Sequence, residues 1–183
     1  MKAIFKDLVW FATVLILLVG VRIFVASPIK VQGESMMPTL VDGEKAIAYK
    51  LGDVKRFDVV PLVAPDDPSL NYVKRVIGLP GDTVSYKADQ LYINGEPLPE
   101  EYLTEYKDEW HTAGNNAPLT PDFTLGELTG HETVPENTYF VLGDNRQVSK
   151  DSRYPEVGFI PKDNIIGKAK VTIWPPSEWG IIE

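Results

Sequence analysis

Serine attacks a carbonyl group only when a neighbouring base takes its proton, because the hydroxyl itself is weakly reactive. A histidine base is poorly supported in this sequence, since Gly33 to Met37 (GESMM) lacks the second glycine of a G-x-S-x-G nucleophile turn. His111 and His131 have no partner at metal-ligand spacing and are expected to be solvated surface residues. The chain has no cysteine, so the remaining candidate chemistry pairs a serine with a lysine base.

Lys74 is the candidate base. A lysine amine accepts a proton only when it is neutral, so its ordinary pKa of ~10.4 must be lowered to about 8 or below by burial. The run Asn71 to Gly78 (NYVKRVIG) is typical of a strand, which places Tyr72 and Lys74 on one face and Arg75 on the other. Arg75 is therefore expected to matter much less for catalysis. The alternative is an exposed lysine on a half-solvated strand, since most lysines stay in water.

Ser35 is the candidate nucleophile, and it lies a few residues after a long apolar segment. Pro38 limits Gly33 to Leu40 (GESMMPTL) to a turn or an extended conformation. The adjacent Met36 and Met37 indicate either core packing or an apolar surface that faces lipid. Taken alone, this segment also fits a purely structural loop.

The apolar segment, Leu8 to Ala26, runs for 19 residues in which Thr13 and Arg22 are the only polar side chains. As a helix it would be ~28 Å long, close to the ~30 Å hydrocarbon core of a bilayer. A cleaved secretory signal peptide is the alternative, but a cut after Ala26 would place the large Phe24 at the third position before it. The segment therefore predicts an uncleaved transmembrane anchor.

Lys2 and Lys6 precede the span, and the positive-inside rule then places the N-terminus in the cytoplasm. Residues 1–27 are expected to form the cytoplasmic end and the anchor. Residues 28–183 are expected to form an extracytoplasmic domain at the cell membrane, in a single-pass protein. The formal net charge of −8 argues against a nucleic-acid partner.

Beyond the anchor the pattern predicts an all-β domain of short strands with turn residues between them. Leu79 to Asp82 (LPGD) suits a type II turn, and Asn94-Gly95 suits a type I′ hairpin. The stretch at about 96–135 is rich in Glu, Thr, Pro and Gly and is interpreted as an insertion outside the core. The end of the chain after Trp174 is expected to be an extended tail. The expected strands are Lys45 to Ala48, Asp58 to Val63, Tyr72 to Ile77, Gln90 to Ile93, Thr138 to Leu142 and Gly167 to Trp174.

Four segments in this order resemble the sequence boxes of type I signal peptidases, in their short Gram-positive-type bacterial form. They are Gly33 to Leu40 (GESMMPTL), Lys55 to Val60 (KRFDVV), Tyr72 to Asp82 (YVKRVIGLPGD) and Gly143 to Arg153 (GDNRQVSKDSR). The resemblance extends from the anchor to Gly167. It implies an antiparallel β-sheet catalytic domain whose variable part is inserted between the third and fourth boxes, where the polar stretch lies.

The resemblance also implies residue roles: Ser35 as nucleophile, Lys74 as general base and Ser149 as the side chain that orients the lysine. Asp151 and Arg153 would support the site, and Asp144, Asn145 and Arg146 would shape its turn. The Ser35 backbone N–H would stabilise the oxyanion. Gly33 stands where many relatives have a serine that supplies a second donor, so that donor remains open. Val148 stands where the fourth box usually has asparagine.

The implied reaction is removal of signal peptides from secreted preproteins after small residues (Ala-x-Ala sites), through an acyl-enzyme and without metal or cofactor. Signal peptides and membrane lipid would be the partners, close to the secretion translocon. Two alternatives remain. A related self-cleaving Ser-Lys peptidase would carry a DNA-binding domain in place of an anchor, and a membrane-tethered β domain would bind surface partners without catalysis.

Overall fold

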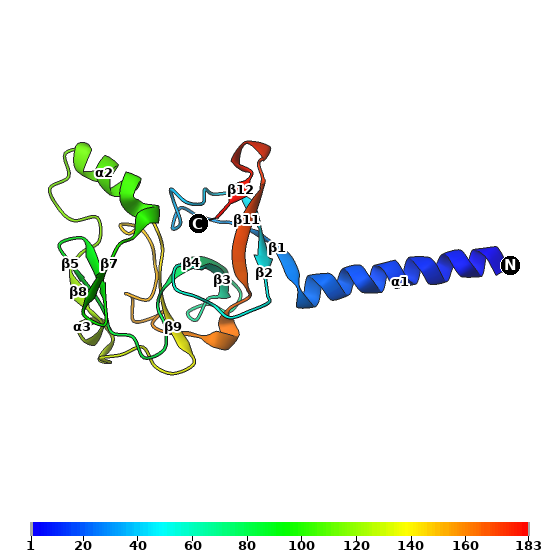
Figure 1. Cartoon of the computed structure of the whole chain (residues 1–183), viewed down its shortest axis with the longest axis horizontal. Coiled ribbons are helices and arrows are strands. Elements are labelled where there is room, and N and C mark those ends of the chain that lie inside the picture. Colours follow the sequence, from blue (N-terminus) through cyan, green and yellow to red (C-terminus); the bar gives the residue numbers. More distant parts are fainter. Residues whose placement is uncertain (1, 183) are drawn as a thin grey trace.

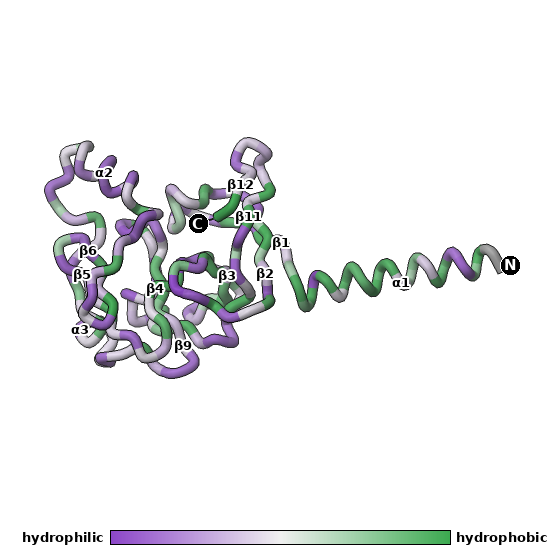
Figure 2. Tube along the Cα trace, viewed as in Figure 1, coloured by the Kyte–Doolittle hydropathy of each residue, from purple (hydrophilic) through white to green (hydrophobic). Residues whose placement is uncertain are grey.

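The computed structural model describes residues 2–182; Met1 and Glu183, the outer ends of the two expected domains, lie outside the described residues. Helix α1 (Lys2–Phe24) projects away from a body of β-strands (Figure 1). Its part from Ile4 to Phe24 has a mean hydropathy of 2.2 and is long and apolar enough to cross a membrane. Figure 2 shows this helix as mostly hydrophobic, with hydrophilic stretches near its N-terminal end and near the body.

The junction between α1 and the body is short and hydrogen-bonded. Only Val25 separates α1 from strand β1 (Ala26–Lys30), so the helix ends two residues before the expected boundary at Ala26. The Val25 N–H donates to the Val21 carbonyl at 2.9 Å, and the Ser27 hydroxyl donates to the Arg22 carbonyl at 2.8 Å. The helix therefore passes into the sheet without a flexible linker.

The larger sheet is antiparallel and has the strand order β1-β2-β11-β3-β4-β9-β10, with β12 paired to β11. The expected all-β class is confirmed, and each expected strand in both sheets is observed with ends shifted by one residue at most. The tail after Trp174 is not extended as expected, because a 3₁₀ turn returns β12 to β11. The bounds in this sheet are β2 (Lys45–Tyr49), β3 (Val59–Val63), β4 (Asn71–Gly78), β9 (Thr138–Leu142), β10 (Ile160–Pro161), β11 (Lys168–Trp174) and β12 (Gly180–Ile181).

A second sheet, ordered β7-β6-β5-β8, lies at the end of the body that faces away from α1 (Figure 1). Asn94 and Gly95 both have positive φ (53° and 82°), as the predicted type I′ hairpin requires. Asp82 N–H donates to the Leu79 carbonyl at 3.0 Å, which closes the predicted turn there. The elements here are β5 (Val84–Lys87), β6 (Gln90–Ile93), β7 (Glu96–Leu98), α2 (Thr104–Thr112), β8 (Phe123–Thr124) and α3 (Leu125–Thr129).

The expected insertion at about 96–135 coincides with only part of this second sheet, because β5 and β6 precede it. It also contributes to a hydrophobic core, contrary to the expectation that it lies outside one. Phe123, Leu125 and Val134 are buried and pack with Ile77 and Phe140 of the larger sheet. The reason is that these apolar residues are isolated in the sequence and become neighbours only after folding.

Candidate active site

Ser35 and Lys74 line the same cavity, which has a volume of ≈ 670 Å³. Ser35 lies in the turn that connects β1 with β2, and Lys74 lies in the middle of β4. The other residues that line the cavity are Gln32, Gly33, Glu34, Asp42, Tyr72, Val148 and Lys150. The two residues whose chemistry the sequence singled out are therefore brought together from separate elements.

Buried apolar side chains hold the Ser35 turn in place. Met36 and Leu40 are buried in one core cluster, so Met36 packs inside the protein and does not face lipid. Gly33 has a φ of 82°, and its N–H donates to Asp42 Oδ1 at 2.7 Å. Glycine accepts this conformation without steric cost. None of the hydrogen bonds within residues 2–182 uses the Ser35 N–H.

Lys74 is buried, with only 3% of its surface exposed, so the alternative that it is an exposed lysine is wrong. Burial lowers the pKa of its ammonium to about 8, against the opposite effect of Asp151. Tyr72 lies on the same face of β4, and Lys74 Nζ is 5.3 Å from the centroid of its ring. A large fraction of this amine is therefore neutral near pH 8, as a base requires.

The structure records no hydrogen bond between the Ser35 hydroxyl and Lys74 Nζ among the described residues. Such catalytic bonds are often long until substrate binds. Ser149 contributes a buried hydroxyl that has no hydrogen-bond partner within residues 2–182. Because a buried polar group without a partner is costly, this hydroxyl is a candidate for a functional contact.

Backbone contacts fix the loop after β9 against the Ser35 turn. The Asn145 N–H donates to the Ser35 carbonyl at 3.1 Å, and the Ser149 N–H donates to the Asn145 carbonyl at 3.0 Å. A Cβ atom placed on Gly143 would collide with Ser149 Oγ and with the Ser35 carbonyl oxygen. Only glycine allows the two segments to approach this closely.

The buried Asp151 and the partly buried Arg153 form a support for the same loop. Arg153 donates to both carboxylate oxygens of Asp151, from Nε at 2.8 Å and from Nη2 at 2.9 Å. The Gly143 N–H donates to Asp151 Oδ2 at 2.9 Å. These bonds connect the loop's beginning with its end, which agrees with a supporting role.

Arg75 occupies the opposite face of β4 but is not the peripheral residue that the alternation suggests. It is fully buried, donates to Asp144 at 2.7 Å and lies 3.8 Å from the centroid of the Tyr102 ring. Asp144 also accepts a hydrogen bond from the Thr39 hydroxyl at 2.6 Å, within the segment that follows Ser35. β4 lies between β3 and β9, and its residues from Lys74 to Gly78 are all buried, so both of its faces carry buried groups.

Arg146 reaches away from the cavity into the second sheet. It donates to Glu100 Oε1 at 2.6 Å and to the Tyr86 hydroxyl at 2.7 Å. Burial alone would raise the pKa of Glu100, but Arg146 and Lys107 hold it at about 2. No pattern in the sequence points to Glu100 or Tyr86, since both lie far from Arg146 along the chain. This buried group joins the loop after β9 to the second sheet.

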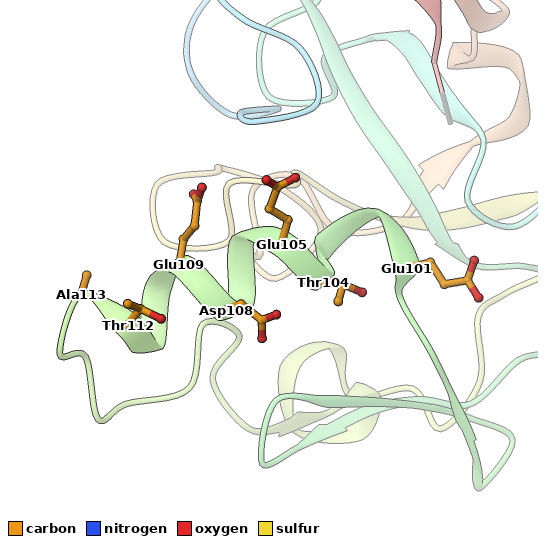
Figure 3. A pocket seen from close by; sticks show the side chains of 7 residues that line it. All are labelled: Glu101, Thr104, Glu105, Asp108, Glu109, Thr112 and Ala113. Atoms are coloured by element: carbon orange, nitrogen blue, oxygen red, sulfur yellow. The ribbon is translucent and has the colours of Figure 1, made fainter.

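A separate hollow runs along α2 and is lined by acidic side chains, including Glu105, Asp108 and Glu109 (Figure 3). All of its lining residues lie between Glu101 and Ala113, on one stretch of chain. It contains none of the candidate site residues. His111 and His131 are exposed, as expected.

A β domain behind an apolar helix long enough to span a membrane, with a serine and a buried lysine on one cavity, is the arrangement expected of an anchored serine hydrolase. Comparison with protein families agrees: residues 4–174 match the family described as signal peptidase, peptidase S26. The chain belongs to this family. It is an enzyme, a serine endopeptidase.

Individual relatives are similar over most of their length. The chain is 44% identical to a signal peptidase I of Bacillus caldolyticus, over 91% of this chain and 88% of the relative. It is 40% identical to signal peptidase IB of Staphylococcus aureus strain COL, over 97% and 93%. A crystal structure of a signal peptidase I from Enterococcus faecalis V583 is 44% identical, with a TM-score of 0.59 over 65% of this chain and 98% of that chain.

Proposed function

We propose that this enzyme removes signal peptides from secreted preproteins, cutting after small residues of the Ala-x-Ala type through a Ser35–Lys74 dyad. The observation that carries the proposal is a buried Lys74, with a pKa of about 8, on the cavity that Ser35 also lines. The sequence relationship to signal peptidases I supports the substrate class. Among the groups that line this cavity, Lys74 is the one whose pKa burial lowers toward neutrality.

In the proposed reaction, neutral Lys74 takes the proton of the Ser35 hydroxyl, and the alkoxide attacks the carbonyl carbon of the scissile bond. The Ser35 N–H donates to the developing oxyanion. The Lys74 ammonium then protonates the leaving amine, which leaves an acyl-enzyme on Ser35. Lys74 next takes a proton from water, and the hydroxide attacks the acyl carbon. As the bond to the Ser35 oxygen breaks, the Lys74 ammonium returns the proton to that oxygen, which releases the signal peptide and regenerates Ser35 and neutral Lys74. Ser149 would orient the Lys74 amine with its buried hydroxyl.

The full chain in detergent should therefore cleave a purified preprotein that carries an Ala-x-Ala site, whereas Ser35→Ala should not. Gel electrophoresis and mass spectrometry of the new N-terminus measure the product. Binding without cleavage by the wild-type protein would instead favour the non-enzymatic tethered domain. Cleavage of the chain itself, with the preprotein intact, would favour the self-cleaving peptidase.

We also propose that residues 1–27 hold the enzyme in the cell membrane with the N-terminus inside and residues 28–183 outside, near the translocon. Lys2 and Lys6 before the apolar span support this orientation. Protease added to intact spheroplasts should digest the domain, and a cytoplasmic marker protein should survive. Protection of the domain until the membrane is opened would reverse the orientation.

A further inference from the structure

Two residues that line the same cavity, Tyr72 and Lys150, are joined by a third, Asp66, outside the Ser35, Lys74 and Ser149 group. Lys150 Nζ donates to Asp66 Oδ2 at 2.6 Å, and the Tyr72 hydroxyl donates to the same oxygen at 3.0 Å. Asp66 comes from the loop between β3 and β4, and Lys150 from the loop after β9. We call Asp66, Tyr72 and Lys150 the rim cluster.

An isolated surface ion pair contributes little to stability, so a contribution to stability does not by itself explain the rim cluster. Asp66 is mostly shielded from solvent, with 13% of its side chain exposed. Its second oxygen, Oδ1, is buried and has no hydrogen-bond partner within residues 2–182. A carboxylate held with one oxygen unsatisfied is a poor stabilising device. Both of its hydrogen-bond partners line the cavity, which points to a role there.

The rim cluster fixes the Tyr72 ring. Burial, followed by the Asp66 hydrogen bond, raises the pKa of Tyr72, so the phenol keeps its proton and remains the donor. The Lys150 hydrogen bond lowers the pKa of Asp66, so the acceptor stays ionised. The ring that is held in this way lies 5.3 Å from Lys74 Nζ, beside it on the wall of the cavity, and Lys74 is only 3% exposed.

We infer that Asp66 and Lys150 are positioning residues for catalysis: they clamp the Tyr72 hydroxyl so that the ring keeps water away from the Lys74 amine. The inference rests on the proposed function, because it matters only if Lys74 is the base. Lys74 itself makes no hydrogen bond to this cluster among the described residues, so the effect passes through the ring.

Removal of Asp66 has two opposite effects on Lys74, and this makes the sign of the result diagnostic. Loss of the Asp66 negative charge alone lowers the pKa of Lys74, whereas release of the ring admits water and raises it. The other charged groups around Lys74 stay unchanged. They are Asp144 and Asp151, which raise its pKa, Arg153, which lowers it, and Glu34, Asp42 and Lys150 on the cavity wall.

The test compares Asp66→Ala with Asp66→Asn in the full chain in detergent, with kcat/KM for an Ala-x-Ala peptide measured against pH. In Asp66→Ala the pH at which kcat/KM rises should increase by roughly one unit. At a pH below 8, kcat/KM should then be about tenfold lower than in wild type, and well above pH 8 it should be unchanged. In Asp66→Asn the amide oxygen still accepts a hydrogen bond from the Tyr72 hydroxyl, so the pH at which kcat/KM rises should stay the same or decrease. Tyr72→Phe keeps the ring but removes its hydrogen bond to Asp66, so this pH should increase.

A downward shift of the pH profile in Asp66→Ala, or no shift, would overturn the inference. A downward shift would mean that Asp66 acts on Lys74 only through its charge, and no shift would mean that it does not affect Lys74. Asp108→Ala on α2 is the matched control and should leave the profile unchanged, because this carboxylate is exposed and remote from the cavity. If Asp66→Ala fails to fold, Tyr72→Phe supplies the same sign test. Failure of the proposed function is distinct: Lys74→Met would then cleave normally, and the inference would fall with it.

Discussion

Lys74→Met should give a folded protein whose kcat/KM for a preprotein is lower by at least about a thousandfold. Methionine keeps the approximate length and the apolar packing of the buried side chain but cannot accept a proton. Ser35→Ala should have a similar effect, and the double variant should be no worse than either single one, since the two act as a unit. Steady-state kinetics with a purified preprotein, together with a melting curve, measures this.

The wild-type pH profile belongs to the same prediction. Lys74 is active as the neutral amine, so activity should be low below its pKa and rise through about pH 8. Lys74→Arg should also be inactive, because a guanidinium stays protonated. Lys87→Met, the same change at an exposed position on β5, is the control and should retain full activity. Near wild-type cleavage by Lys74→Met would show that another group is the base.

Gly143→Ala should lower kcat by about a hundredfold or more while the protein still folds. The new methyl group would collide with Ser149 Oγ and the Ser35 carbonyl oxygen, so the loop must move away from the nucleophile turn. A displacement of about 1 Å is enough to disrupt catalytic geometry. The free energy of unfolding should fall by about 1–3 kcal/mol, as is usual for overpacking. Kinetics and denaturant unfolding measure the two effects separately.

Gly180→Ala is the matched control for this change, because a Cβ atom there meets its nearest neighbour only at 4.0 Å and the residue has no positive φ. It should leave both activity and stability close to wild type. A fully active Gly143→Ala enzyme would mean that the loop and the Ser35 turn can separate without consequence. The close approach at Gly143 would then be incidental to catalysis.

The strands that the sequence predicted correctly are those with alternating or continuous apolar residues between clear turn signals, such as Thr138 to Leu142. The sequence missed β1, which contains Pro28 and does not resemble a strand by itself. Proline is tolerated there because β1 lies at the edge of the sheet, where not every N–H needs an acceptor. The two-residue strand β8 was also missed, because Phe123 pairs with Tyr86 of β5 and the two residues become neighbours only in the folded chain.

Within the candidate site, local alternation correctly predicted the shared face of Tyr72 and Lys74. It could not predict that Lys74 is buried, since burial depends on neighbouring segments. It also suggested a minor role for Arg75, whose partner Asp144 is 69 residues away. Long-range polar pairs of this kind leave no periodic trace in the sequence. The catalytic roles themselves stay predictions that the kinetic experiments above decide.

The one-residue junction at Val25 has a consequence for how substrates are selected. A flexible linker would let the active site occupy many heights above the bilayer, so its effective concentration at any one height would be low. Here β1 continues almost directly from α1 and extends about 16 Å before the Ser35 turn begins. In the proposed orientation the site therefore works within a narrow layer above the membrane surface. A peptide bond is then selected by its distance from the bilayer as well as by the residues that flank it, and diffusion in two dimensions delivers it to the enzyme.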